Sequence, residues 1–234
     1  MSKKFKKARS ASAAATNGAA GVRTLEVTSP KDDHEAPSAQ PVQADRAPSR
    51  RTVRAIAVGL TVLVALVFFR VATFQFVSFD DPSSVYNNPH VTQGLTAESI
   101  RWAFTDTATF YWQPLTYLSH MLVVQVLGMN SGWHHVVNVI IHAANVLLLF
   151  FFLRRLTGAV WRSAAVATLF AVHPLAVESV AWVTERNNLL VGLFWIATMW
   201  AYVDYVRRPS TGRYLLVAAG LALKPAHDWF YLYY

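Results

Sequence analysis

The chain contains no cysteine among its 234 residues. Disulfide bonds, zinc–thiolate sites and thiol nucleophiles are therefore excluded, although nothing follows about the redox compartment. Charged residues are also scarce. They make up 15% of the sequence, where a soluble domain carries about 25%, and 54% of the residues are hydrophobic. This balance is typical of a protein whose main surroundings are lipid.

Positive charge is concentrated near the N-terminus. Residues 1–54 hold eleven Lys or Arg against five Asp or Glu, a net +6 of the whole chain's +8. Because these basic residues lie in a tail and not on a folded face, no nucleic-acid partner is predicted. Residues 1–50 are rich in Ser, Ala, Pro, Lys and Arg without sustained periodicity. We expect a disordered, basic cytoplasmic tail ahead of a transmembrane domain over 51–234.

Apolar runs bounded by arginines predict an all-α, polytopic membrane helix bundle with about four to five spans. The expected spans lie near 55–76, 134–153, 163–180, 189–206 and 214–223. With the tail inside, the arginine-rich loops 154–162 and 207–213 are inside as well, as the positive-inside rule requires. We therefore expect a multi-pass protein of the inner (plasma) membrane, in contact with membrane lipid, with its N-terminus in the cytoplasm.

The long outer segment between the first two spans contains two further helical patterns. Residues 95–104 are amphipathic and carry Trp and Phe, which favours an interfacial helix. Pro114 precedes an apolar run over 115–127 that is too short to span a bilayer and is expected at the outer leaflet. Within the span 163–180, His173-Pro174 is expected to loosen the helix and free a backbone carbonyl.

A polar stripe runs along the span 134–153. His135, Asn138, His142 and Asn145 are separated by three, four and three residues, so they share one face of a helix. Polar groups are costly in lipid, and this face must therefore look into the bundle or a wet cavity. Hydrogen bonding between helices is the favoured interpretation for the two asparagines, whereas a ligand-binding role for His135 stays open. As a metal site the stripe is weak, and no metal ligand is assigned.

The pair Asp80-Asp81 is the sharpest local feature. Two adjacent carboxylates at a membrane exit, followed by Pro82, are untypical of a helix interior. They could hold a divalent cation beside a phosphate, or one of them could act as a general base for a hydroxyl group. On local pattern alone, an ordinary acidic turn is the more common explanation.

Short motifs of polar and aromatic residues follow one another between about Arg70 and Pro225. They are Phe79-Asp80-Asp81, Asn87-Asn88-Pro89-His90-Val91, Trp112-Gln113-Pro114-Leu115-Thr116, His134-His135-Val136-Val137-Asn138, His142-Ala143-Ala144-Asn145, Phe170-Ala171-Val172-His173-Pro174, Glu178-Ser179-Val180-Ala181-Trp182 and Glu185-Arg186. In order and spacing these motifs resemble the transmembrane and tetratricopeptide-repeat (TMTC) family and its bacterial relatives. Members of that family are integral membrane glycosyltransferases of the GT-C class.

The resemblance implies a polyprenyl-phosphate-linked sugar donor and transfer to a protein or glycan acceptor on the outer face, as in O-mannosyltransferases. It also implies a catalytic acid in the first outer loop, which maps onto Asp80 or Asp81. Histidine and arginine groups would then receive the departing lipid phosphate. The expected substrate-binding residues are His134, His135, Glu178, Glu185 and Arg186.

The family's membrane core continues through further spans and ends in helical repeats of about 34 residues, which this chain lacks. We therefore expect a truncated N-terminal part of a glycosyltransferase that carries part of the catalytic face, and not a complete enzyme. The alternative is a non-catalytic membrane scaffold whose polar stripe only packs helices or binds a partner. A small transporter is disfavoured, because its polar site would lie at the midplane of the membrane.

Overall fold

The computed structural model describes residues 48–105 and 112–222, and within these ranges it contains helices and no strand. The all-α prediction is confirmed. The predicted tail over 1–50 lies outside the described residues except for its last three positions, as does the ending 223–234. The helices are α1 (Arg50–Phe68), the 3₁₀ turn η1 (Phe69–Thr73), the π turn η2 (Pro82–Tyr86), α2 (Pro89–Thr92), α3 (Ala97–Thr105), α4 (Pro114–Leu127), α5 (Ser131–Thr157), α6 (Val160–Ala171), α7 (Ala176–Ala181), α8 (Arg186–Arg207) and α9 (Thr211–Ala222).

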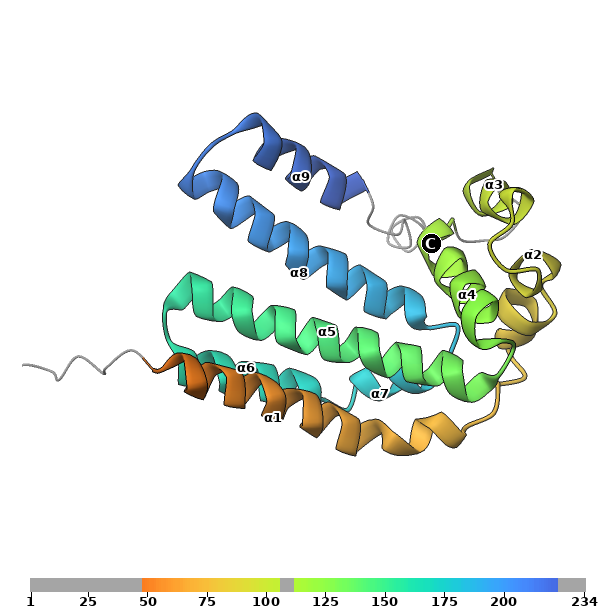
Figure 1. The fold of residues 1–234 in the computed structure, drawn as a ribbon, viewed down its shortest axis with the longest axis horizontal. Helices are drawn as coiled ribbons and strands as arrows, with labels where there is room; N and C mark the ends of the chain where they lie inside the picture. Colours follow the sequence, from red (N-terminus) through yellow and green to blue (C-terminus); the bar gives the residue numbers. More distant parts are fainter. Residues whose placement is uncertain (1–47, 106–111, 223–234) are drawn as a thin grey trace, which may run out of the picture. The chain divides into compact units, whose positions relative to one another are not determined.

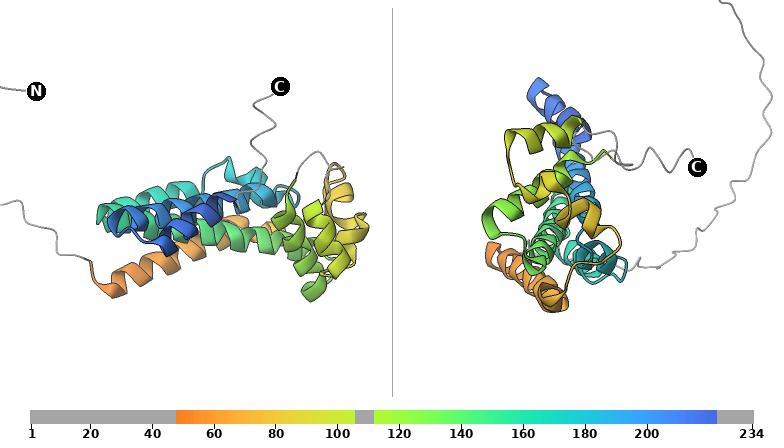
Figure 2. Two further views of the ribbon diagram at one scale, coloured as in Figure 1. Left: turned by 90° about the horizontal axis from the view of Figure 1, so that it is seen from above. Right: turned by 90° about the vertical axis from the view of Figure 1, so that its right-hand side faces the viewer.

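Helix α5 lies at the centre of the bundle, with α1 and α6 on one side and α8 on the other (Figure 1). Helix α9 packs on the outer side of α8, and the view along the helices in Figure 2 shows the same order. The main core joins α1, α5 and α6 through fully buried side chains such as Val64 and Phe150. Ala167 and Ala171 of α6 are fully buried as well, because small side chains let neighbouring helices approach closely.

Three helical segments are long and apolar enough to cross a membrane: Arg50–Thr73, Ser131–Thr157 and Arg186–Arg207. They correspond to the predicted spans 55–76, 134–153 and 189–206. Only a minority of each apolar stretch is buried inside the protein, so most of its surface faces outward, as lipid contact requires. The other two predicted spans are shorter helices. At 12 residues each, α6 and α9 reach about 18 Å, against about 30 Å of hydrocarbon.

The predicted loosening at His173-Pro174 is confirmed. Helix α6 ends at Ala171, and the short helix α7 begins beyond Pro174, whose ring nitrogen carries no hydrogen to donate. Ala171 is the last residue of α6, so its carbonyl has no partner within the helix, and a ring nitrogen of His142 on α5 lies 3.1 Å from it. The residues predicted as one span over 163–180 therefore form two helices joined by a turn.

The segment between α1 and α5 forms a second, smaller core. Both predicted helices are present, as α3 and α4. The residues buried between α2, α3, α4 and η2 are Val85, Val91, Ala103, Tyr117, Met121 and Val183, with Trp102 packed against them. His90 stacks on Trp102 at 4.6 Å between ring centroids, which fixes α2 against α3. This core covers the end of the bundle at which α5 and α8 begin (Figure 1).

The two ends of the bundle differ in charge. Helix α1 begins at the same end at which α5 and α8 finish, and α6 and α9 begin there too (Figure 1). Arginines gather at this arginine-rich end: Arg50, Arg51, Arg54, Arg154, Arg155, Arg162, Arg207, Arg208 and Arg213. The predicted loops 154–162 and 207–213 therefore lie together with the start of α1. The acidic pair and the paired histidines lie toward the opposite end.

The α5 stripe predicts a measurable loss of stability. His142→Phe keeps a ring of similar shape but removes the partner of the Ala171 carbonyl, which should destabilise the protein by about 0.6–2 kcal/mol. Thermal unfolding of the purified protein in detergent measures this change. Ile140→Phe, at an exposed position of the same helix, serves as the control. Equal melting temperatures for the two variants would show that this hydrogen bond contributes nothing.

Candidate functional site

Arg186, the first residue of α8, is fully buried at the end of the bundle remote from the arginine-rich end. Its Nε donates to Oδ1 of Asn138 at 2.7 Å, its Nη1 to Oγ of Ser119 at 3.2 Å and its Nη2 to the carbonyl of His134 at 2.8 Å. All three acceptors are neutral. Arg186 therefore joins α4, α5 and α8 while its charge is not neutralised by a contacting carboxylate.

Within the described residues, the only ion pair joins Arg155 and Asp204, at the opposite end of the bundle. A buried cation without a paired anion is costly, and neutral hydrogen-bond acceptors compensate for only part of the lost hydration. The guanidinium of Arg186 is therefore a buried positive charge that no contacting carboxylate offsets. The N-terminus of the 22-residue helix α8 adds the positive end of its dipole at the same point.

Asp81 is fully buried and its carboxylate accepts three hydrogen bonds. One oxygen accepts from the backbone N–H of Val77 at 2.8 Å. The other accepts from the backbone N–H and the hydroxyl of Thr184, at 3.1 and 2.5 Å. Thr184 lies two residues before Arg186, so Asp81 fixes the chain that leads into α8 and thereby the position of Arg186.

Asp80 differs from its neighbour. It is half-buried, and its carboxylate has no hydrogen-bond partner within the described residues. Its backbone carbonyl accepts from the N–H of Ser84 at 3.0 Å and from the hydroxyl of Ser83 at 3.1 Å, which closes the turn into η2. Of the two adjacent carboxylates, one is therefore fully engaged and the other is available.

The paired histidines are both fully buried. His134 places its Nδ1 3.1 Å from Nδ1 of His120 on α4, and His135 meets the ring of Phe74 edge-on. Burial, helped by the neighbouring charge of Arg186, holds the pKa of His120 well below its ordinary value, so this ring is neutral at pH 7.

Some ring nitrogens at this site lack a hydrogen-bond partner within the described residues. They are Nε2 of His120 and Nε2 of His134. His135 lies within electrostatic reach of both Asp81 and Arg186. The site therefore has unused hydrogen-bonding capacity beside its buried positive charge.

The two predicted glutamates differ in their position relative to this cluster. Glu178 is an exposed residue of α7, and its backbone carbonyl accepts from the N–H of Trp182 at 3.0 Å. Glu185 is half-buried directly before α8 and accepts from Nδ2 of Asn188 at 2.6 Å. The structure therefore brings together Asp81, His134, His135 and Arg186, with Asp80 and Glu185 next to them in the chain, and leaves Glu178 outside.

Three residues of the site were not predicted from the sequence. Ser119 and His120 lie on the buried face of α4, which was interpreted only as an apolar helix. Their spacing from Thr116, at three and four residues, is a polar stripe that could have revealed them. Thr184 offers no such signal, because nothing in the sequence relates it to Asp81, 103 residues earlier.

The two carboxylates differ in their freedom to hold a divalent cation. The oxygens of Asp81 already accept hydrogen bonds from Val77 and Thr184 and are therefore occupied. The geometry supports a hydrogen-bonding role for Asp81.

Comparison with known proteins gives one consistent result. The chain is 32% identical to protein O-mannosyl-transferase TMTC1 of Mus musculus over 186 residues, which cover 72% of this chain and 19% of the relative. It is 32% identical to Tmtc2 of Drosophila melanogaster, over 63% of the chain and 17% of the relative. It is 31% identical to human TMTC4, over 63% of the chain and 23% of the relative.

This chain is TMTC-like. It spans about a fifth of the length of the TMTC relatives it matches. No family model matches the chain, and no solved structure matches it significantly. The TMTC resemblance predicted from the ordered motifs is confirmed, and the bacterial type of the chain stays a prediction.

Asp81→Asn should destabilise this TMTC-like protein by about 1–3 kcal/mol, because an amide places hydrogens where the carboxylate accepts three hydrogen bonds. Thermal unfolding in detergent measures the loss. Glu98→Gln, at an exposed position of α3, is the matched control and should leave the melting temperature unchanged. An unaltered melting temperature in Asp81→Asn would contradict the anchoring role.

Proposed function

We propose that this chain forms the N-terminal, catalytic-face part of a membrane glycosyltransferase. It transfers a sugar from a polyprenyl-phosphate donor to a hydroxyl of a protein or glycan acceptor on the outer face of the membrane. The relatives named protein O-mannosyl-transferase support the reaction class and a protein acceptor. The donor is the one that the family resemblance implies and the site's chemistry suits, and the side of the membrane is inferred from the distribution of arginines.

The buried charge of Arg186 is the observation that carries the proposal. A departing polyprenyl phosphate takes the electron pair of the broken sugar–oxygen bond and gains negative charge in the transition state. A fixed positive potential at low dielectric stabilises that charge more than it stabilises the bound donor. Arg186 and the start of α8 supply this potential, and Nε2 of His134 and Nε2 of His120 supply hydrogen-bonding capacity for phosphate oxygens.

The two adjacent carboxylates have different proposed roles. Asp80 is the general base: its available carboxylate takes the proton of the acceptor hydroxyl as that oxygen attacks the anomeric carbon. Asp81 is a positioning residue, because its bonds to Thr184 hold the strand of chain that ends at Arg186. Asp80 is the chain neighbour of Asp81, and the bonds from Thr184 to Asp81 therefore connect the base with the segment that leads to Arg186.

Asp80→Asn should lower the rate of sugar transfer by about 100- to 10,000-fold while leaving thermal stability unchanged, since its carboxylate is free. The assay follows transfer of labelled mannose from polyprenyl-phosphate mannose to a protein acceptor, in membranes containing the chain. A chimera that continues the chain with the remainder of mouse TMTC1 is assayed in parallel. Glu178→Gln, outside the cluster, is the control.

A chimera that folds, inserts and transfers no sugar would favour the non-catalytic scaffold. An active chimera in which Asp80→Asn keeps near-full activity would remove Asp80 as the base. Loss of activity in Asp81→Asn that follows its loss of stability would agree with positioning.

Orientation is part of the proposal. The arginine-rich end lies on the cytoplasmic side of the inner membrane, and the site lies outside, because positively charged loops are retained in the cytoplasm. In the cysteine-free chain, Ser83→Cys should react with a membrane-impermeant thiol reagent in intact cells, and Ser210→Cys should react only after lysis. Both positions are exposed. The reverse labelling pattern would overturn the orientation.

A further inference from the structure

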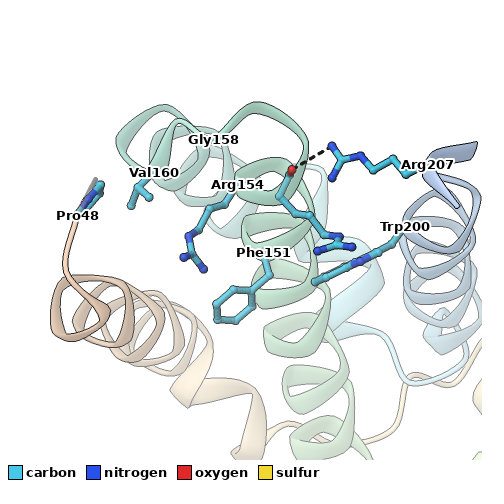
Figure 3. Close-up of a pocket in the computed structure, with 8 residues that line it drawn as sticks. Pro48, Phe151, Arg154, Gly158, Val160, Trp200 and Arg207 are labelled. Carbon is cyan, nitrogen blue, oxygen red and sulfur yellow. Dashed lines mark hydrogen bonds between the residues drawn. The ribbon is translucent and has the colours of Figure 1, made fainter. Parts of the chain in front are cut away.

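A cavity of about 440 Å³ lies at the arginine-rich end, far from the site described above. It is bounded by the entry to α1, the last turns of α5, the start of α6 and the C-terminal half of α8 (Figure 3). The lining residues are Pro48, Phe151, Arg154, Arg155, Gly158, Val160, Trp200 and Arg207. None of them is used by the proposed glycosyltransferase site.

The cavity carries an excess of positive charge. Arg155 is paired with Asp204, which its Nη2 contacts at 2.6 Å. Arg207 donates only to the backbone carbonyl of Arg155, at 3.3 Å, and Arg154 has no partner within the described residues. Three guanidinium groups against one carboxylate leave two positive charges. In Figure 3, Arg154 extends from α5 into the space between α5 and α1.

The rest of the lining is apolar. Phe151, Val160 and the half-buried Trp200 lie beside the guanidinium groups. The cavity also lies at membrane-interface depth, because Arg154, Arg155 and Arg207 occupy the last turns of two membrane-spanning helices. Phosphate groups bind arginine forks, and the apolar wall suits the glycerol and upper acyl region of a lipid. A soluble anion would make no use of that wall.

We propose that this cavity binds the phosphate headgroup of an anionic phospholipid, with Arg154 and Arg207 contacting the phosphate and Trp200 the glycerol region. Basic pockets between membrane helices are suited to such headgroups. The cavity and Arg186 lie at opposite ends of α8. The proposed lipid site is therefore independent of the proposed transferase activity, and each can be tested without the other.

Native mass spectrometry of the purified full chain in neutral detergent tests the proposal. Dioleoylphosphatidylglycerol should bind at least about tenfold more tightly than zwitterionic dioleoylphosphatidylcholine. Arg154→Gln should weaken phosphatidylglycerol binding about fivefold, the equivalent of about 1 kcal/mol. Arg162→Gln removes the same charge from an exposed position at the same end, outside the cavity, and should leave the affinity unchanged.

Three outcomes would overturn the proposal: equal affinity for the two lipids, an equal loss in Arg162→Gln and Arg154→Gln, or displacement of the lipid by a large molar excess of inorganic phosphate. The last result would assign the cavity to a soluble anion. If Arg154→Gln does not give folded protein, Arg207→Gln provides the same comparison. Its side chain makes only one bond to the backbone within the described residues, and a similar weakening is expected.

Discussion

In lipid, each backbone carbonyl without a hydrogen bond costs several kcal/mol, and the broken helices around α5 present several such groups. The polar stripe of α5 meets them. Asn138 donates to the carbonyls of Val180 and Trp182 at the end of α7. Asn145 adds a bond to the carbonyl of Leu189, inside α8. Helix α5 thus supplies donors where the bundle is interrupted between α6 and α8.

The same stripe explains how a charged group is held inside the bundle. While the amide nitrogen of Asn138 satisfies the turn after α7, its oxygen accepts from Arg186. The helix break and the buried guanidinium therefore share one asparagine. The sequence favoured a helix-packing role for Asn138. In the structure its side chain both joins two helices and holds Arg186 in the candidate site.

The sequence predicted the helical architecture well, because span length, flanking arginines and proline positions are local signals. Residues 134–153 were recognised inside the longer helix α5, and a loosened helix at Pro174 was expected, where the chain in fact divides into α6 and α7. The length of α6 was overestimated, since hydropathy does not report where a helix stops when turn residues such as Val172 are apolar.

The candidate site was predicted in part. His134, His135 and Arg186 converge as the motifs implied, but the motifs did not separate Asp80 from Asp81. Two of the three hydrogen bonds that Asp81 accepts come from Thr184, 103 residues away, which no local pattern encodes. Glu178 was included because it shares the same end of the bundle. A shared end of the bundle only shows that residues lie in the same broad region. Whether a residue contacts the site depends on the path of the loop that carries it.

The short helix α6 has a consequence for how the protein enters the membrane during synthesis. Twelve residues are too few to be retained by the bilayer as an independent span. Its buried face is covered by α1 and α5, which emerge from the ribosome first, and its last carbonyl requires His142 of α5. Integration of α6 must therefore follow that of α5 and depend on tertiary contacts already made. In this region, insertion and folding are a single process in which the earlier helices serve as the acceptor surface for the later ones.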